Sequence, residues 1–218
     1  MALLTASWRL LLILIFVTIV NALSDDEIAM FQCDNHVEGN TGVSGTVAIA
    51  TEGEFHIITS NGVPDHKTAE FPNNDNPNDV TEQTIQWTIP VNPVAGATTS
   101  LPMGPIGVAI NGIPFFSPYT SDGLDAVETE VFDDCDGHPT QTGAYHYHKM
   151  PSSCVFDVIE GQPSSVIGVA FDGFLIYGPN DENGVTLTSG DLNDCHGRIV
   201  DGKYRYHATS DFPYTIGC

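Results

Sequence analysis

The sequence predicts an all-β protein, a sandwich or open barrel built from an internally duplicated unit, with at most one or two short helices. The chain holds 21 glycines and 14 prolines among 218 residues, a composition that favours short strands and many turns over long helices. Several segments alternate apolar and polar residues with a period of two, which is typical of a half-buried strand. One set of motifs also occurs twice in the same order, which indicates a repeated structural unit.

Strands are expected along most of the chain. Val47 and Ile49 alternate with small or polar residues, and the apolar segment 55–59 is followed by the turn dipeptide Asn61-Gly62. We expect residues 25–80 to form N-terminal strands that pack on a main domain of residues 81–218. Strands are predicted at 45–51, 55–59, 84–91, 108–110, 145–149, 166–177 and 203–208.

One helix is predicted after residue 120. Ser121 or Asp122 is a suitable N-cap, and Leu124, Val127 and Val131 recur at helical spacing. We expect these three apolar side chains to lie on one face of that helix. The polar segment 73–79 has no candidate core residue and is expected to be a loop.

Residues 1–24 have the layout of a secretory signal peptide. An apolar run of 11 residues, from Leu10 to Val20, follows Arg9, and cleavage is expected near Ala22 or Ser24. An uncleaved anchor is the alternative, but the run is shorter than the ~20 residues that span a bilayer. The sequence therefore predicts a secreted, extracellular protein with no membrane association after signal removal.

The charge balance limits the partners of the chain. Six basic residues stand against 28 acidic ones, which gives a formal net charge of −22. Nucleic-acid binding is excluded because a phosphate backbone requires a basic surface, and binding to an anionic membrane surface is disfavoured for the same reason. The acidity suits an extracellular or mineralised matrix.

Three blocks of sequence are duplicated. Residues 107–118 align with 168–179 at an offset of 61, residues 134–137 with 194–197 at an offset of 60, and residues 143–148 with 202–207 at an offset of 59. The drift in offset corresponds to one-residue deletions in loops. We define copy one as residues 107–154 and copy two as residues 168–218.

Five cysteines follow the signal segment. The repeat predicts the matched disulfides Cys135–Cys154 and Cys195–Cys218, and leaves Cys33 as the odd one. Pairings that cross between the copies remain open on sequence grounds. Because the chain has no C-x-x-C pair, a thiolate zinc site is not expected.

The duplicated motifs resemble a known family. The segment that ends in Tyr145-His146-Tyr147-His148 is similar to the extracellular YHYH domain, which is called after this tetrapeptide. The G-I-P-F-F stretch from Gly112, the D-G-F-L-I-Y-G-P stretch from Asp172 and the closing P-Y-T-I-G-C support the resemblance, which covers roughly residues 85–218. It implies an extracellular location and no particular reaction. Copy two departs from the pattern, because its tetrapeptide contains Arg205.

The first tetrapeptide is a candidate metal site. His146 and His148 are two apart, so in a strand both project from the same face. Such a pair suits copper or zinc better than calcium, and His138 could return as a third ligand. If the two copies pack about a pseudo-twofold axis, His207 comes near His148. Second-rank candidates are Asp134, Asp136 and His196.

Copy two has arginines where copy one has histidines. The alignment places His138 opposite Arg198 and His146 opposite Arg205. Arginine does not ligate metals because it stays protonated. We therefore expect Arg198 and Arg205 to bind an anion, such as a carboxylate, sulfate or phosphate.

Three functions are consistent with these residues. The leading hypothesis is a secreted, disulfide-stabilised binding module with a copper or zinc site at the first tetrapeptide. The alternatives are an extracellular metalloenzyme, a hydrolase or copper oxidase, that uses the same histidines with Asp134 or Glu130 as base, and an acidic structural matrix protein without a specific ion. Calcium binding at the D-x-D-G segment from Asp134 is a weaker prediction, since no glutamate completes the loop.

Overall fold

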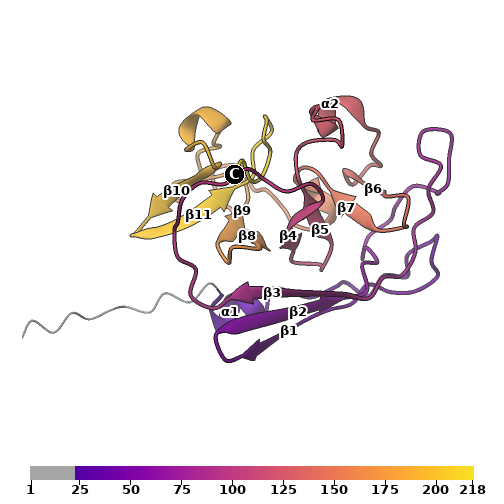
Figure 1. Cartoon of the computed structure of the whole chain (residues 1–218), viewed down its shortest axis with the longest axis horizontal. Coiled ribbons are helices and arrows are strands. Elements are labelled where there is room, and N and C mark those ends of the chain that lie inside the picture. The colour runs from indigo at the N-terminus through magenta and orange to yellow at the C-terminus, as the bar shows by residue number, and fades with distance from the viewer. Residues whose placement is uncertain (1–22) are drawn as a thin grey trace, which may run out of the picture.

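The structure is a computed structural model that describes residues 23–218, and it is built from two β-sheets with little helix (Figure 1). The smaller sheet is antiparallel, in the order β1-β2-β3. The predicted all-β class is confirmed. The strands of the smaller sheet are β1 (Val47–Glu52), β2 (Phe55–Ser60) and β3 (Ile85–Pro90).

The larger sheet has eight strands in the order β10-β11-β9-β8-β4-β5-β7-β6. Copy one supplies the second half of this order and copy two supplies the first half. The two sheets do not close into a barrel and pack face to face, so of the predicted alternatives the sandwich describes the fold. The strands are β4 (Pro105–Ala109), β5 (Pro114–Phe116), β6 (Gly137–Pro139), β7 (Tyr145–Tyr147), β8 (Val166–Ala170), β9 (Leu175–Tyr177), β10 (Gly197–Val200) and β11 (Lys203–His207).

The sequence duplication is also a duplication of structure. Within each copy, the first two strands are antiparallel, the second pairs in parallel with the fourth, and the third and fourth form an antiparallel hairpin. The copies join through the antiparallel pair β4–β8, in which Val108 lies opposite Val169. These two valines occupy the same position in the two copies, so the pseudo-twofold axis runs between them.

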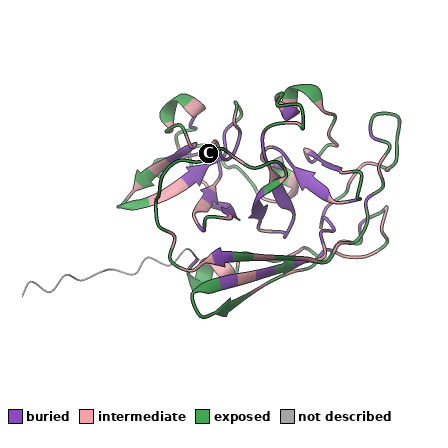
Figure 2. Cartoon of the chain, viewed as in Figure 1, coloured by how far each residue is buried: buried purple, intermediate pink, exposed green. Residues whose placement is uncertain are grey.

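The smaller sheet covers one face of the larger one, as Figure 1 shows. Val108 and Val169 are fully buried there against Ile58 and Ile89. Alternation along the strands explains this arrangement, because one face of each strand turns towards the other sheet and the opposite face towards solvent. Figure 2 shows buried positions between less buried ones in β2 and β3, while β1 alternates intermediate and exposed residues along its first half.

The predicted domain boundary at residue 81 falls just before β3. This strand pairs with β2 along its whole length, so the smaller sheet combines residues from both predicted segments. The predicted signal peptide lies outside the described residues except for Leu23 and Ser24. Leu23 is buried in the core between the sheets, and Ser24 caps the short helix α1 (Asp25–Ile28). Within residues 23–218, no helix has both the length and the apolar character needed to cross a membrane.

The one helix predicted from the sequence corresponds to α2 (Ala126–Thr129), and the prediction was wrong in where the helix starts and how it packs. Helix α2 is capped by Asp125, whose carboxylate accepts from the backbone N–H groups of Val127 and Glu128. Residues 120–124 instead form a hydrogen-bonded turn. Leu124 and Val131 are more than half exposed, because the helix ends after four residues and never aligns them on one face. Short 3-10 helices also occur at Ser152–Cys154 and Ser189–Asp191.

Candidate metal centre

The hairpin β6–β7 brings the three histidines of copy one together. His138 in β6 lies directly opposite His146 in β7. His148 follows two residues later and projects from the same face as His146. The register of the β6–β7 pair therefore adds His138 to the predicted pair of ligands, His146 and His148. The sequence alone does not show this register.

The three imidazoles meet through the same ring atom. The Nε2 atom of His146 lies 3.1 Å from Nε2 of His138 and 3.1 Å from Nε2 of His148. All three residues are buried, and together they form a group whose ligand atoms could hold one metal ion.

The other ring nitrogens fix the orientation of the rings. Nδ1 of His138 donates to the carbonyl of Val131 at 2.9 Å, and Nδ1 of His148 donates to the carbonyl of Ser117 at 2.7 Å. Nδ1 of His146 donates to its own hairpin, at 3.2 Å from the carbonyl of Ala144. Since a carbonyl only accepts, each Nδ1 carries the hydrogen and each neutral Nε2 presents a lone pair to the cluster. Metal-ligating histidines are held by outer hydrogen bonds of this kind.

Glu130 contributes a carboxylate to the cluster. Its Oε2 atom lies 3.2 Å from Nε2 of His138 and 3.4 Å from Nε2 of His148. Glu130 follows the C-terminal end of α2, in a segment without regular periodicity. For this reason the sequence suggested it only as an alternative base and not as a neighbour of all three histidines.

Burial sets the protonation of these groups. It lowers the pKa of His138, lowers that of His146 further, and lowers the pKa of His148 to about 4. It also raises the pKa of the Glu130 carboxyl group. The histidines are therefore neutral at pH 7, which is the form that binds metals.

The cluster opens into a groove of about 590 Å³. Phe116 stacks on His146 with ring centroids 3.9 Å apart, and Phe132 packs on His138 at 4.6 Å. These rings shield the imidazoles on two sides while the groove keeps one approach to them. No lysine or arginine is among the residues that line the groove, which disfavours anionic ligands.

The structure does not bring His207 to this cluster. The hairpins β6–β7 and β10–β11 lie at the two ends of the larger sheet, with β9, β8, β4 and β5 between β11 and β7. The pseudo-twofold axis passes through the centre of the sheet, so symmetry separates His148 from His207 instead of joining them.

The second-rank candidates also lie elsewhere. Asp134 is exposed, and Asp136 forms an ion pair with Lys149 at 2.7 Å. His196 is buried, with Nε2 2.9 Å from Oγ1 of Thr209. Arg198 and Arg205 both contact the carboxylate of Glu182, so the chain itself supplies the kind of anion that these arginines were expected to bind.

Both matched disulfides are confirmed. Cys135 is bonded to Cys154 and Cys195 to Cys218. Cys33 is a free thiol that donates to the carbonyl of Asn111 at 3.3 Å. Burial, with the nearby carboxylates of Asp65 and Asp34, raises the pKa of this thiol to about 12, so Cys33 is a thiol at neutral pH.

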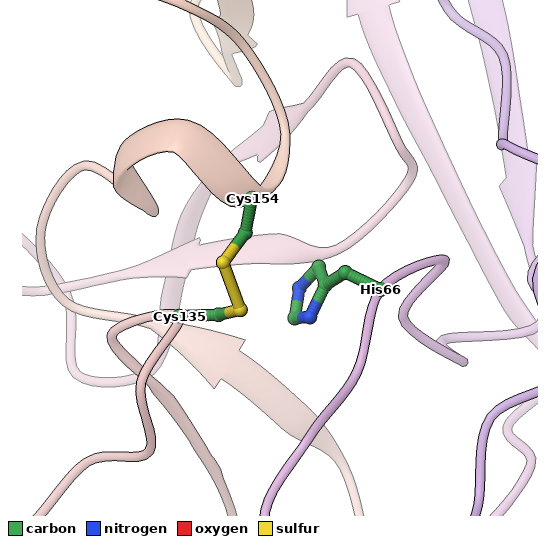
Figure 3. A group of neighbouring side chains, drawn as sticks. All are labelled: His66, Cys135 and Cys154. Carbon is green, nitrogen blue, oxygen red and sulfur yellow. A yellow bond between two sulfur atoms is a disulfide. The ribbon is translucent and has the colours of Figure 1, made fainter.

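A second group, His66 with Cys135 and Cys154, has its ligand atoms close together. Figure 3 shows the imidazole of His66 beside the disulfide. The two sulfur atoms are bonded to each other and offer no thiolate. Nε2 of His66 lies 2.6 Å from the hydroxyl of Tyr147 and accepts its hydrogen. This group is therefore a packing unit between the N-terminal segment and copy one.

The comparisons with known proteins agree with the motifs. Residues 86–186 match the family model described as YHYH protein. This segment includes all of copy one and the beginning of copy two. Comparison with curated proteins and with solved structures finds no match. Residues 86–186 are therefore similar to the YHYH family, and this segment contains the whole histidine cluster.

Proposed function

We propose that the chain is an extracellular, disulfide-stabilised module that binds one copper or zinc ion through Nε2 of His138, His146 and His148. The observation that carries this proposal is the convergence of three buried Nε2 lone pairs, with Nε2 of His146 3.1 Å from each of the other two and every Nδ1 held by a carbonyl. Three lone pairs that face one another repel, and a cation between them removes the repulsion.

The spacing of the ligand atoms suits a transition metal. With metal–nitrogen bonds of ~2.0–2.1 Å and tetrahedral angles, two ligand nitrogens lie about 3.3 Å apart. The observed 3.1 Å requires only small movements of the rings. Imidazole ligands favour zinc and copper over calcium or magnesium.

The electrostatics favour a cation as well. Three neutral imidazoles and one carboxylate give the cluster a formal charge of −1, and the chain as a whole carries −22. Glu130 sits within 3.4 Å of two of the three Nε2 atoms. It is therefore placed to serve as a fourth ligand or to accept a hydrogen bond from water at the ion.

Two disulfides support the extracellular part of the proposal, because such bonds persist in oxidising compartments. Residues 1–24 were predicted to be a secretory signal peptide. An acidic module with a shielded metal site is compatible with a matrix or a cell surface.

A metalloenzyme is the second candidate, and the groove favours it. Catalytic zinc sites have three protein ligands and an open fourth position, and here the groove reaches all three histidines. In that case Glu130 would accept the proton from water activated at the ion. Because neither lysine nor arginine lines the groove, a neutral or cationic substrate fits better than an anionic one.

The metal content of the secreted protein tests the proposal. After loading with copper or zinc and dialysis, mass spectrometry should find one ion per wild-type chain and none in His146→Ala/His148→Ala. Arg205→Ala/His207→Ala, which alters the equivalent positions of copy two, is the matched control and should keep one ion. Circular dichroism confirms folding of each variant. A folded wild-type chain that retains neither metal would overturn the proposal and leave the tetrapeptides as packing motifs.

A further inference from the structure

Copy two contains a counterpart of the histidine cluster. His207 has the position of His148, Arg205 that of His146, and Arg198 that of His138. In the hairpin β10–β11, Arg198 lies directly opposite Arg205. The pairing is the same as that of His138 with His146 in copy one.

The hydrogen bond that orients the histidine shared by both copies is repeated. Nδ1 of His207 donates to the carbonyl of Gly178 at 2.9 Å, and Nδ1 of His148 donates to that of Ser117 at 2.7 Å. Gly178 and Ser117 are equivalent positions of the two copies. Nε2 of His207 therefore presents its lone pair to the cluster, as Nε2 of His148 does.

In copy two a guanidinium group meets this lone pair. Nε of Arg205 donates to Nε2 of His207 at 3.0 Å, where copy one has two Nε2 atoms 3.1 Å apart. The guanidinium carbon of Arg205 lies 4.3 Å from the ring centroid of Tyr177. Tyr177 has the position of Phe116, which stacks on His146, so the aromatic wall of the site is retained.

A carboxylate completes copy two, but it comes from a different segment. Glu182 lies 2.9 Å from Nη2 of Arg198 and 3.3 Å from Nη2 of Arg205. It belongs to the loop after β9, whereas Glu130 follows α2. Asp181 lies farther away, 4.0 Å from Arg198. Counted over Arg198, Arg205, His207 and Glu182, the cluster of copy two has a formal charge of +1. A divalent ion would give the same charge to the cluster of three histidines and Glu130 in copy one.

We infer that copy two is a transition-metal site of the same design, in which the guanidinium groups of Arg198 and Arg205 hold the place of the ion. Copy two keeps the lone pair of His207, an aromatic wall and a carboxylate. Only the ligands at the positions of His138 and His146 are replaced, by arginines that carry a fixed positive charge. The chain then binds one ion rather than two. Replacing both arginines by histidine would open a second site for copper or zinc. The inference depends on the proposed function only for the choice of metal.

The test is the metal stoichiometry of Arg198→His/Arg205→His, measured by mass spectrometry after loading with zinc or copper. We expect two ions per chain, against one in the wild type. In the His146→Ala/His148→Ala background, the same change should raise the content from zero to one. Arg198→Lys/Arg205→Lys keeps the charge without new ligands and is the control, with an unchanged stoichiometry.

The outcomes separate the two claims. A wild type that binds one ion, with no gain in a folded Arg198→His/Arg205→His, overturns the inference and leaves the proposed function intact. The other outcome is a wild type that binds no metal, while Arg198→His/Arg205→His in the His146→Ala/His148→Ala background binds one ion. This result overturns the proposed function alone.

A measurement on the wild type covers the case in which the variant does not fold. After treatment with a chelator, hydrogen exchange should accelerate in the hairpin β6–β7 and stay unchanged in β10–β11. Equal acceleration in both hairpins would contradict the assignment of the arginines to the place of the ion.

Discussion

Cys135 and Cys154 stand on either side of the three histidines in the chain, so their disulfide closes the loop that carries all three. The bond between Cys195 and Cys218 encloses the arginine counterpart in copy two in the same way. Their sequence separations are 19 and 23 residues. Closing a loop of this length contributes ~3 kcal/mol by restricting the unfolded chain.

We predict that Cys135→Ala/Cys154→Ala weakens metal binding by roughly tenfold or more. Without the disulfide, the loop must be ordered when the ion binds. If ion binding has to supply about half of the ~3 kcal/mol, the affinity falls by about 1.4 kcal/mol, which is tenfold. Cys195→Ala/Cys218→Ala is the matched control and should lose stability without losing affinity. Competition titration with a chromogenic zinc chelator measures both. Equal losses of affinity in the two variants would show that the enclosed loop does not act on the site.

Much of this arrangement was readable from the sequence. Because the motifs are duplicated with nearly constant offsets, the sequence predicted both disulfides and the two-copy architecture. Alternation in a strand also placed His146 and His148 on one face. These features are local or are repeated, so they do not require knowledge of strand order.

The distance of His207 from the histidine cluster could not be predicted from the sequence, for a physical reason. A pseudo-twofold relation does not say where its axis lies, and only the central pair of Val108 with Val169 shows that the axis is far from both hairpins. Glu130 and Glu182 were missed as neighbours of the clusters because they lie in loops. Their places depend on how α2 and the segment after β9 return to the hairpins.

Replacing Glu130 with glutamine should reduce the affinity for zinc by about 10–100-fold, the usual loss when a group that supports a metal site is removed. The amide keeps the size of the side chain and removes its charge, so folding should be unaffected. Isothermal titration of the loaded and apo proteins provides the measurement, with Glu128→Gln, an exposed neighbour on α2, as control. An affinity within twofold of the wild type would remove Glu130 from the site.

Leu23 is 2 % exposed and packs with Phe31, Ile58 and Ile89 between the sheets. Leu23→Ala should therefore lower the free energy of unfolding by ~2–5 kcal/mol, the range for a buried leucine. Leu124→Ala, at a position 55 % exposed, should change it by no more than about 0.5 kcal/mol. Urea unfolding measures both. If the two variants lose similar free energy, the segment at Leu23 is not part of the core. If the predicted signal peptide is removed, the burial of Leu23 favours cleavage near Ala22 over cleavage near Ser24, and the intact mass of the secreted chain distinguishes the two.

Two histidines of copy two should make the protein sensitive to acid. Burial lowers the pKa of His196 and His207 from 6.5 to about 4 in the folded chain. Between these values the unfolded chain binds protons that the folded chain does not. The free energy of unfolding is therefore unaffected by these groups above pH 6.5 and falls as the pH decreases from 6.5 to 4. Each histidine contributes a slope of up to about 1.4 kcal/mol per pH unit in that window.

Urea unfolding from pH 7 to pH 4, with a chelator present throughout, measures this slope without competition from bound metal. His196→Gln and His207→Gln should each reduce the slope by up to about 1.4 kcal/mol per pH unit, the contribution of one proton, because glutamine does not titrate. Stability at pH 7 provides the control: a variant that loses stability there but keeps the wild-type slope has lost packing and not a proton. Such a result for both variants would refute the assignment, since the acid sensitivity would then come from other groups.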